Sequence, residues 1–156
     1  MLDLPSDHFS VTAVLLKKAS QHRWASHSWS LLGVMPGLSE TQLSNAQESG
    51  ELHYYSDLHL RLFRHYCESY YHNLMSEQAK IYFIGRLEND QLSPVLLTVD
   101  FDEAASYMEA GDQVLEAPLP DELCVWLERF LLYHYAPEAP KKRRRERWKN
   151  KDGGAR

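Results

Sequence analysis

The chain is poor in the residues on which disulfide frameworks and phosphate-binding loops depend. It has two cysteines and seven glycines among 156 residues, and two of those glycines fall in the last four positions. Cys67 and Cys124 lie far apart in the sequence, so we expect two packed thiols rather than a disulfide. The sequence has no glycine-rich phosphate loop and no Gly-x-Ser-x-Gly nucleophile elbow. These absences disfavour the familiar nucleotide-binding and hydrolase classes.

Long hydrophobic runs are also missing. No stretch approaches the roughly 20 apolar residues of a membrane-spanning helix. The first seven residues include Asp3 and Asp7, whereas a signal peptide carries basic residues there. We therefore expect a cytoplasmic protein without a membrane partner.

Basic residues are scarce in most of the chain and concentrated at its end. Residues 141–156 hold nine Lys/Arg and two Asp/Glu, whereas residues 1–140 hold eight Lys/Arg and twenty Asp/Glu. The formal net charge of −5 therefore divides into a body of −12 and a tail of +7. Such a body repels the phosphates of a duplex, which disfavours a nucleic-acid reader that uses its folded surface.

Apolar patterning predicts a chain in which strands and helices do not strictly alternate. Period-2 and continuous apolar runs predict strands, and apolar stripes at helical spacing predict helices. We expect strands at 9–17, 24–35, 52–62 (or a hairpin there), 80–87, 93–100 and 114–117, and helices at 64–74, 101–110 and 120–136. Residues 38–50 are polar with little periodicity, which predicts an exposed loop.

Local signals mark several boundaries. Glu88-Asn89-Asp90 is typical of a hairpin turn. Asp100 and Glu103 are spaced as a capping box, in which each side chain accepts an otherwise unpaired N–H, and Gly111 fits a left-handed helix stop. Pro120 suits the first turn of the last helix.

The order of elements favours an α+β fold over a doubly wound sheet. We expect a mainly antiparallel sheet or partly closed barrel with about three packed helices. The predicted organisation is an N-terminal extension at 1–8, a single domain at 9–136 and a basic tail at 137–156.

Catalytic and metal-binding patterns are weak. His59, His65 and His72 lie in one region, but zinc sites use tighter arrangements such as His-Glu-x-x-His, and none occurs. We expect no cofactor, no metal and no catalytic residue, and therefore a protein that is not an enzyme. A small enzyme with an unfamiliar site around these three histidines is the less favoured alternative.

The aromatic residues favour protein binding. Trp and Tyr crowd into the first half of the chain, where most should be core and some should anchor a partner. We single out Arg23, Trp24 and Trp29 as partner-binding candidates.

The basic tail allows three interpretations, for which the candidate residues are Arg143, Arg144, Arg145 and Trp148. The first is a disordered end that aids solubility. The second is a segment that docks onto an acidic surface of a partner or of its own body. The third is a segment that binds nucleic acid weakly and with strong salt dependence, with Trp148 stacking on a base.

Several motifs resemble a bacterial family called domain of unknown function 3305. The likeness begins with Arg23-Trp24-Ala25-Ser26, Trp29 and Gly33-Val34-Met35-Pro36-Gly37, and spans about residues 9–147. It continues through Leu58-x-Leu60, Tyr71-x-Asn73-Leu74, the strand around Ile81–Ile84, Pro94-Val95, Glu103-Ala104-Ala105-x-Tyr107, Pro118-x-Pro120 and the basic ending.

The resemblance implies a role through genomic association, because members are commonly encoded beside formate dehydrogenase genes. It implies an accessory protein in the assembly, maturation or regulation of a molybdenum- or tungsten-dependent formate dehydrogenase. The resemblance assigns no functional residue to this chain. The alternative from the residues themselves is a nucleic-acid-associated regulator that acts through the tail.

Overall fold

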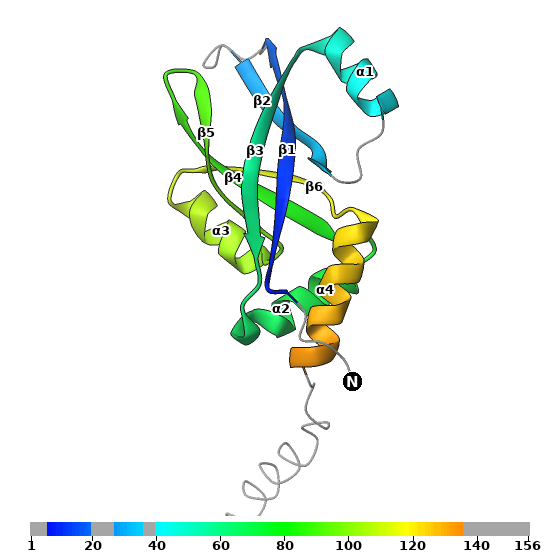
Figure 1. The fold of residues 1–156 in the computed structure, drawn as a ribbon. Helices are drawn as coiled ribbons and strands as arrows, with labels where there is room; N and C mark the ends of the chain where they lie inside the picture. Colours follow the sequence, from blue (N-terminus) through cyan, green and yellow to red (C-terminus); the bar gives the residue numbers. More distant parts are fainter. Residues whose placement is uncertain (1–5, 20–26, 36–39, 136–156) are drawn as a thin grey trace, which may run out of the picture.

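The computed structural model describes residues 6–19, 27–35 and 40–135. No helix within these residues is long and apolar enough to cross a membrane. The elements, shown in Figure 1, follow in the order β1 (His8–Ala19), β2 (His27–Met35), α1 (Glu40–Ser49), β3 (Glu51–Arg61), the 3₁₀ turn η1 (Arg64–Tyr66), α2 (Cys67–Leu74), β4 (Lys80–Glu88), β5 (Gln91–Thr98), α3 (Phe101–Glu109), β6 (Gln113–Pro118) and α4 (Asp121–His134).

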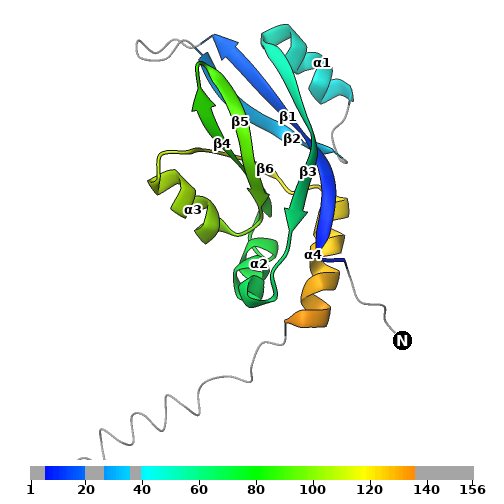
Figure 2. The same cartoon turned by 60° about the vertical axis from the view of Figure 1, so that its left-hand side comes forward.

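The six strands form one mixed sheet in the order β2-β1-β3-β5-β4-β6. All neighbouring strands are antiparallel except β3 and β5, which run parallel and pair through Leu60 and Leu97. The outer strands β2 and β6 contact each other, so the sheet nearly closes into a barrel (Figures 1 and 2). The expected α+β fold with a partly closed barrel is confirmed.

The core fills the barrel and extends to α4. The predicted apolar stripe of α4 is buried from Leu123 to Leu131, with Phe130 and Leu127 each 1% exposed. Inward-facing strand residues such as Leu15, Leu60 and Phe83 belong to the same cluster. Helices α2 and α4 lie together at one end of the barrel, and α1 lies near the other end (Figure 1). Burial of a stripe at helical spacing is the main force that holds α4 on the sheet.

Both cysteines are free thiols, as predicted. Cys67 is buried and Cys124 is half-buried, and burial raises the pKa of both thiols. A raised pKa disfavours the reactive thiolate, so packing accounts for both residues.

The predicted turn and caps are confirmed with one change. Asn89 and Asp90 have φ values of 51° and 65°, as the favoured two-residue hairpin turn requires. Asp100 caps α3 by accepting the N–H of Asp102 at 3.0 Å. The N–H of Asp100 itself donates to the Thr98 hydroxyl, not to Glu103 as the capping box predicts, because the nearer oxygen is two residues back. At the other end of α3, Gly111 has a φ of 97°, as expected of a left-handed stop.

Two further expectations are wrong, and a third is confirmed only over the part that the structure describes. Residues 38–50 were expected to form a loop, but Glu40–Ser49 form α1, which has a buried Ala46 and little apolar surface to reveal it. The strand expected at 24–35 is described from His27 onward, and Trp24 lies outside the described residues. Pro120 is the N-cap of α4 and not a residue of its first turn, so α4 begins one position later. With α1, the fold has four helices in the described residues instead of about three.

Candidate functional site

Trp29 is the one sequence-predicted partner-binding residue that the structure describes. The others, Arg23, Trp24, Arg143, Arg144, Arg145 and Trp148, lie outside the described residues. The Trp29 ring is half-buried on β2 and packs against the barrel core. Its Nε1 is buried and has no hydrogen-bond partner among the described residues.

Trp29 belongs to a polar cluster that closes the barrel where β3 and β5 diverge. We call Lys17, His27, Trp29, Tyr55 and Asp90 the closing cluster. The Tyr55 hydroxyl donates to the carbonyl of Leu92 at 2.6 Å, and Lys17 Nζ donates to the carbonyl of Asp90 at 3.1 Å. Tyr55 spans the opening between β3 and β5, which share a single backbone pairing in the described structure, and Lys17 and His27 reach the β4–β5 turn from β1 and β2.

Lys17 is buried at the centre of this cluster, with 9% of its side chain exposed. Its ammonium lies 3.7 Å from Asp90 Oδ2 and 5.2 Å from the centroid of the Trp29 ring. His27 Nδ1 contacts the same Asp90 oxygen. A buried charge needs such partners, because an unpaired ammonium in the core costs several kcal/mol. The cluster therefore acts structurally, joining β1 and β2 to the β4–β5 turn.

The three histidines singled out from the sequence do not meet. His59 lies on β3, where its Nδ1 is 3.2 Å from the Ser10 hydroxyl. His65 and His72 line a groove beside α2. Within the described residues, no group of three or more His, Cys, Asp or Glu side chains is placed to hold a metal ion.

This groove, which we call the acidic groove, lies between α2, the start of β4 and the start of α3. Its volume is about 900 Å³. Its lining includes aromatic side chains and four acidic residues, Glu68, Glu77, Asp100 and Asp102. Lys80, the one Lys or Arg among the described lining residues, contacts Glu116 at 2.6 Å, and this hydrogen bond raises the pKa of Lys80. The carboxylate of Glu116 therefore offsets the one Lys charge in the groove.

Asn73 and Ser69, neither of which was a functional candidate in the sequence, build the wall of the acidic groove. Asn73 Nδ2 donates to the carbonyls of Lys80 and Val99, and Asn73 Oδ1 accepts the N–H of Lys80 at 3.0 Å. Ser69 Oγ donates to Asp100 Oδ1 at 2.6 Å. These bonds fix α2 against β4 and α3. Val99 lies 26 residues from Asn73 and Asp100 lies 31 residues from Ser69, so no local pattern could have identified these two pairs.

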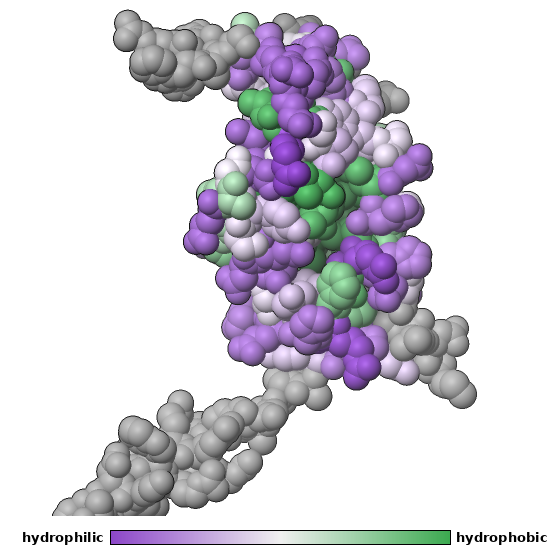
Figure 3. Space-filling model, turned by 90° about the vertical axis from the view of Figure 1, so that its left-hand side faces the viewer, coloured by the Kyte–Doolittle hydropathy of each residue, from purple (hydrophilic) through white to green (hydrophobic). Residues whose placement is uncertain are grey.

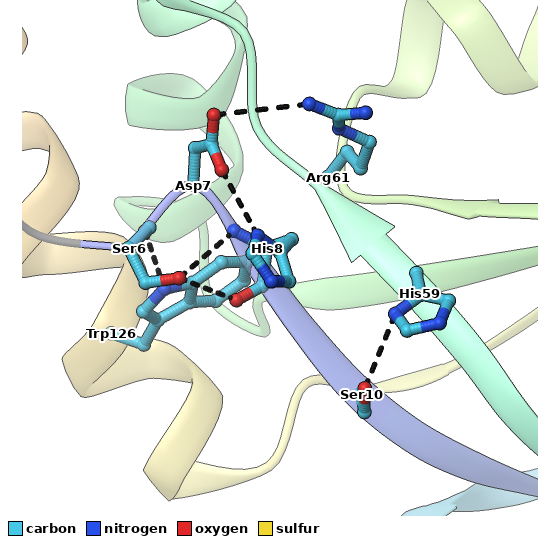
Figure 4. A network of polar contacts seen from close by, with 7 residues as sticks. All are labelled: Ser6, Asp7, His8, Ser10, His59, Arg61 and Trp126. Atoms are coloured by element: carbon cyan, nitrogen blue, oxygen red, sulfur yellow. Dashed lines mark hydrogen bonds and ion pairs between the residues drawn. The ribbon is translucent and has the colours of Figure 1, made fainter.

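A second groove, the N-terminal groove, has a volume of about 740 Å³ and lies between the start of β1, Arg64 and the end of α4. Figure 4 shows the polar network beside it. Trp126 Nε1 donates to the carbonyl of Ser6 at 2.9 Å, which attaches the N-terminal segment to α4. The hydrogen bond with His8 lowers the pKa of Asp7, and Arg61, 3.9 Å away, contributes in the same direction. This groove is polar at its β1 side and aromatic at its α4 side, where Tyr133 lies.

The family model described as "Protein of unknown function (DUF3305)" matches residues 10–145. The chain belongs to this family. No curated protein and no solved structure matches the chain.

The family motif around Tyr71-x-Asn73-Leu74 has a structural explanation in this member. Asn73 makes the three bonds that hold α2 in place, and Leu74 packs against the core. Tyr71 points the other way, with 38% of its surface exposed, and its ring lies 5.4 Å from that of Tyr135 after α4. The motif thus has two structural residues and one that faces solvent.

Large apolar side chains are exposed around both grooves at the end formed by η1, α2 and α4. We call this surface the aromatic end, and its members are Phe63, Tyr66, Tyr71, Met75, Leu132 and Tyr133. Leu132 is 78% exposed and Met75 is 58% exposed. Figure 3 shows another hydrophobic patch, in the middle of the face that is turned toward the viewer. The aromatic end contains three tyrosines, Tyr66, Tyr71 and Tyr133, and tyrosine is typical of protein interfaces.

Proposed function

We propose that the protein is a non-catalytic accessory factor that binds a protein partner through its aromatic end. The observation that carries the proposal is the exposure of six large apolar side chains on η1, α2, α4, the residue before η1 and the residue after α2. On a soluble protein, a large exposed apolar patch often marks a binding site for another molecule. Phe63, Tyr66 and Tyr71 add rigid rings with few rotatable bonds, which lowers the entropy lost on binding.

The expected partner is a molybdenum- or tungsten-dependent formate dehydrogenase or its maturation machinery, in the cytoplasm. This part of the proposal rests on the resemblance of the sequence motifs, which implies a family commonly encoded beside formate dehydrogenase genes. The roles of Arg23, Trp24 and the tail in such binding stay predictions, and so does the alternative of nucleic-acid binding through the tail.

A deletion strain tests the proposed role. We expect deletion of the gene to lower formate dehydrogenase activity and cofactor loading of the enzyme, and a plasmid copy to restore both. Unchanged activity together with unchanged cofactor loading would contradict the formate dehydrogenase assignment.

A further inference from the structure

We infer that the acidic groove is the docking site for the basic segment 141–151 of the same chain. The acidic groove adjoins the proposed partner interface and shares Tyr66 with it, but the inference does not rest on the proposed function. It draws on the charge of the groove, its aromatic lining and the place where the described chain ends.

Charge complementarity is the first argument. Four acidic residues line the groove. One of them, Asp100, is buried and bonded to Ser69 and Asp102, so Glu68, Glu77 and Asp102 carry the accessible charge, and the one lysine is paired. Segment 141–151 carries Lys141, Lys142, Arg143, Arg144, Arg145, Arg147, Lys149 and Lys151 against the single acid Glu146. Attraction between opposite charges at this density raises the local concentration of the segment at the groove. Arginine also forms paired hydrogen bonds with carboxylates, which lysine cannot.

The shape of the groove is the second argument. Tyr66, Tyr82 and Phe101 contribute aromatic lining, and Phe101 is 57% exposed. Such faces accept Trp148 by ring packing and arginine side chains by cation–π contact. A volume of about 900 Å³ suits several side chains of an extended segment and exceeds the need of a single small ion.

The exit point of the tail is the third argument. Tyr135, the last described residue, lies against Tyr71 of α2 with 5.4 Å between ring centroids. Burial raises the pKa of Tyr135, and the nearby carboxylate of Glu68, a lining residue of the groove, adds to the shift. Residues 136–140 include two prolines and can span about 15 Å at about 3 Å per residue. The basic segment therefore begins within reach of the groove.

Backbone NMR of the full chain tests the inference. In low salt, we expect amides of residues 141–151 to show heteronuclear NOE values close to those of the folded body. We expect the amides of Ser69 and Phe101 to shift together with the tail amides as NaCl rises to about 1 M, because salt of that strength screens charges beyond roughly 3 Å. The tail amides should then approach random-coil positions.

A pair of double variants locates the docking site. Glu68→Lys with Glu77→Lys should release the tail in low salt and give the high-salt tail spectrum. The control Glu88→Lys with Glu109→Lys changes the net charge equally at exposed positions outside the groove, and should leave the tail docked.

Four results would overturn the inference. The first is a tail that has random-coil shifts in low salt. The second is a docked tail in the groove variant. The third is docking that depends on protein concentration, which would place the tail on a second copy. The last is ordering of the tail upon addition of a duplex oligonucleotide alone, which would favour the nucleic-acid role.

Discussion

At the scale of single residues, the polar groups that matter most are those buried with partners remote in sequence. Tyr70 is 1% exposed, and its hydroxyl accepts the N–H of Phe63 at 3.0 Å. Asp100 is 2% exposed and accepts from Ser69 and Asp102. The capping role of Asp100 was predictable because its signal is local. Its bond to Ser69 was not, because folding brings together residues that are far apart in the chain.

Tyr70 provides a test of burial through pH. Burial raises the pKa of Tyr70 far above its ordinary value. The phenol therefore ionises more easily in the unfolded chain than in the native fold. The stability that Tyr70 contributes is intact below the unfolded pKa of about 10 and is lost as pH rises above it. We expect Tyr70→Phe to lower the free energy of unfolding by about 1–2 kcal/mol at pH 7, because the N–H of Phe63 loses its acceptor.

Denaturant unfolding of both proteins between pH 7 and pH 12 measures this effect. The stability of Tyr70→Phe should fall less steeply above pH 10 than that of the wild type, because the variant has no buried phenol to ionise. Tyr54→Phe, at a position 51% exposed, is the control and should follow the wild type. Parallel curves for Tyr70→Phe and the wild type would contradict the account.

At the scale of elements, strands were easier to predict than the helix α1. The run from Val11 to Leu16 predicts β1 because nearly every residue in it is apolar, and the structure buries nearly all of them. Asn89 and Asp90 predict the hairpin because its two-residue turn needs positive φ, which Asn and Asp tolerate. Helix α1 has no such signal, since its sequence lacks an apolar stripe and its mean character is polar. The pairing of β3 with β5 joins distant segments, so periodicity could not reveal it.

The closing cluster makes the join between strands testable. We expect Lys17→Met to lower the free energy of unfolding by about 2 kcal/mol, because the carbonyl and carboxylate of Asp90 lose a charged donor. Amide exchange in the β4–β5 turn should also become faster, because the turn loses its attachment to β1. Lys18→Met, at the exposed neighbouring position, should change stability by less than about 0.5 kcal/mol. Equal stability and exchange in the two variants would show that the cluster does not hold the turn.

At the scale of the whole molecule, the proposed docking pairs the basic tail with the acidic groove of the body. The family and the α+β class followed from motifs and patterning that cover nearly the whole chain. The two grooves and the aromatic end did not, because each collects residues from separate elements. Phe63 and Leu132, for example, are far apart in sequence and share an end of the barrel only once α4 packs beside α2.

Affinity capture with the full chain tests most directly whether the aromatic end binds the proposed partner. The purified wild type should retain formate dehydrogenase or one of its maturation proteins from cells that produce the enzyme. Leu132→Asp should lose at least tenfold of the captured protein while its melting temperature stays near that of the wild type, because Leu132 is 78% exposed. Met108→Asp, the matched change near the end of α3 at a position 55% exposed, should capture as well as the wild type. Equal capture by Leu132→Asp and the wild type would contradict the account.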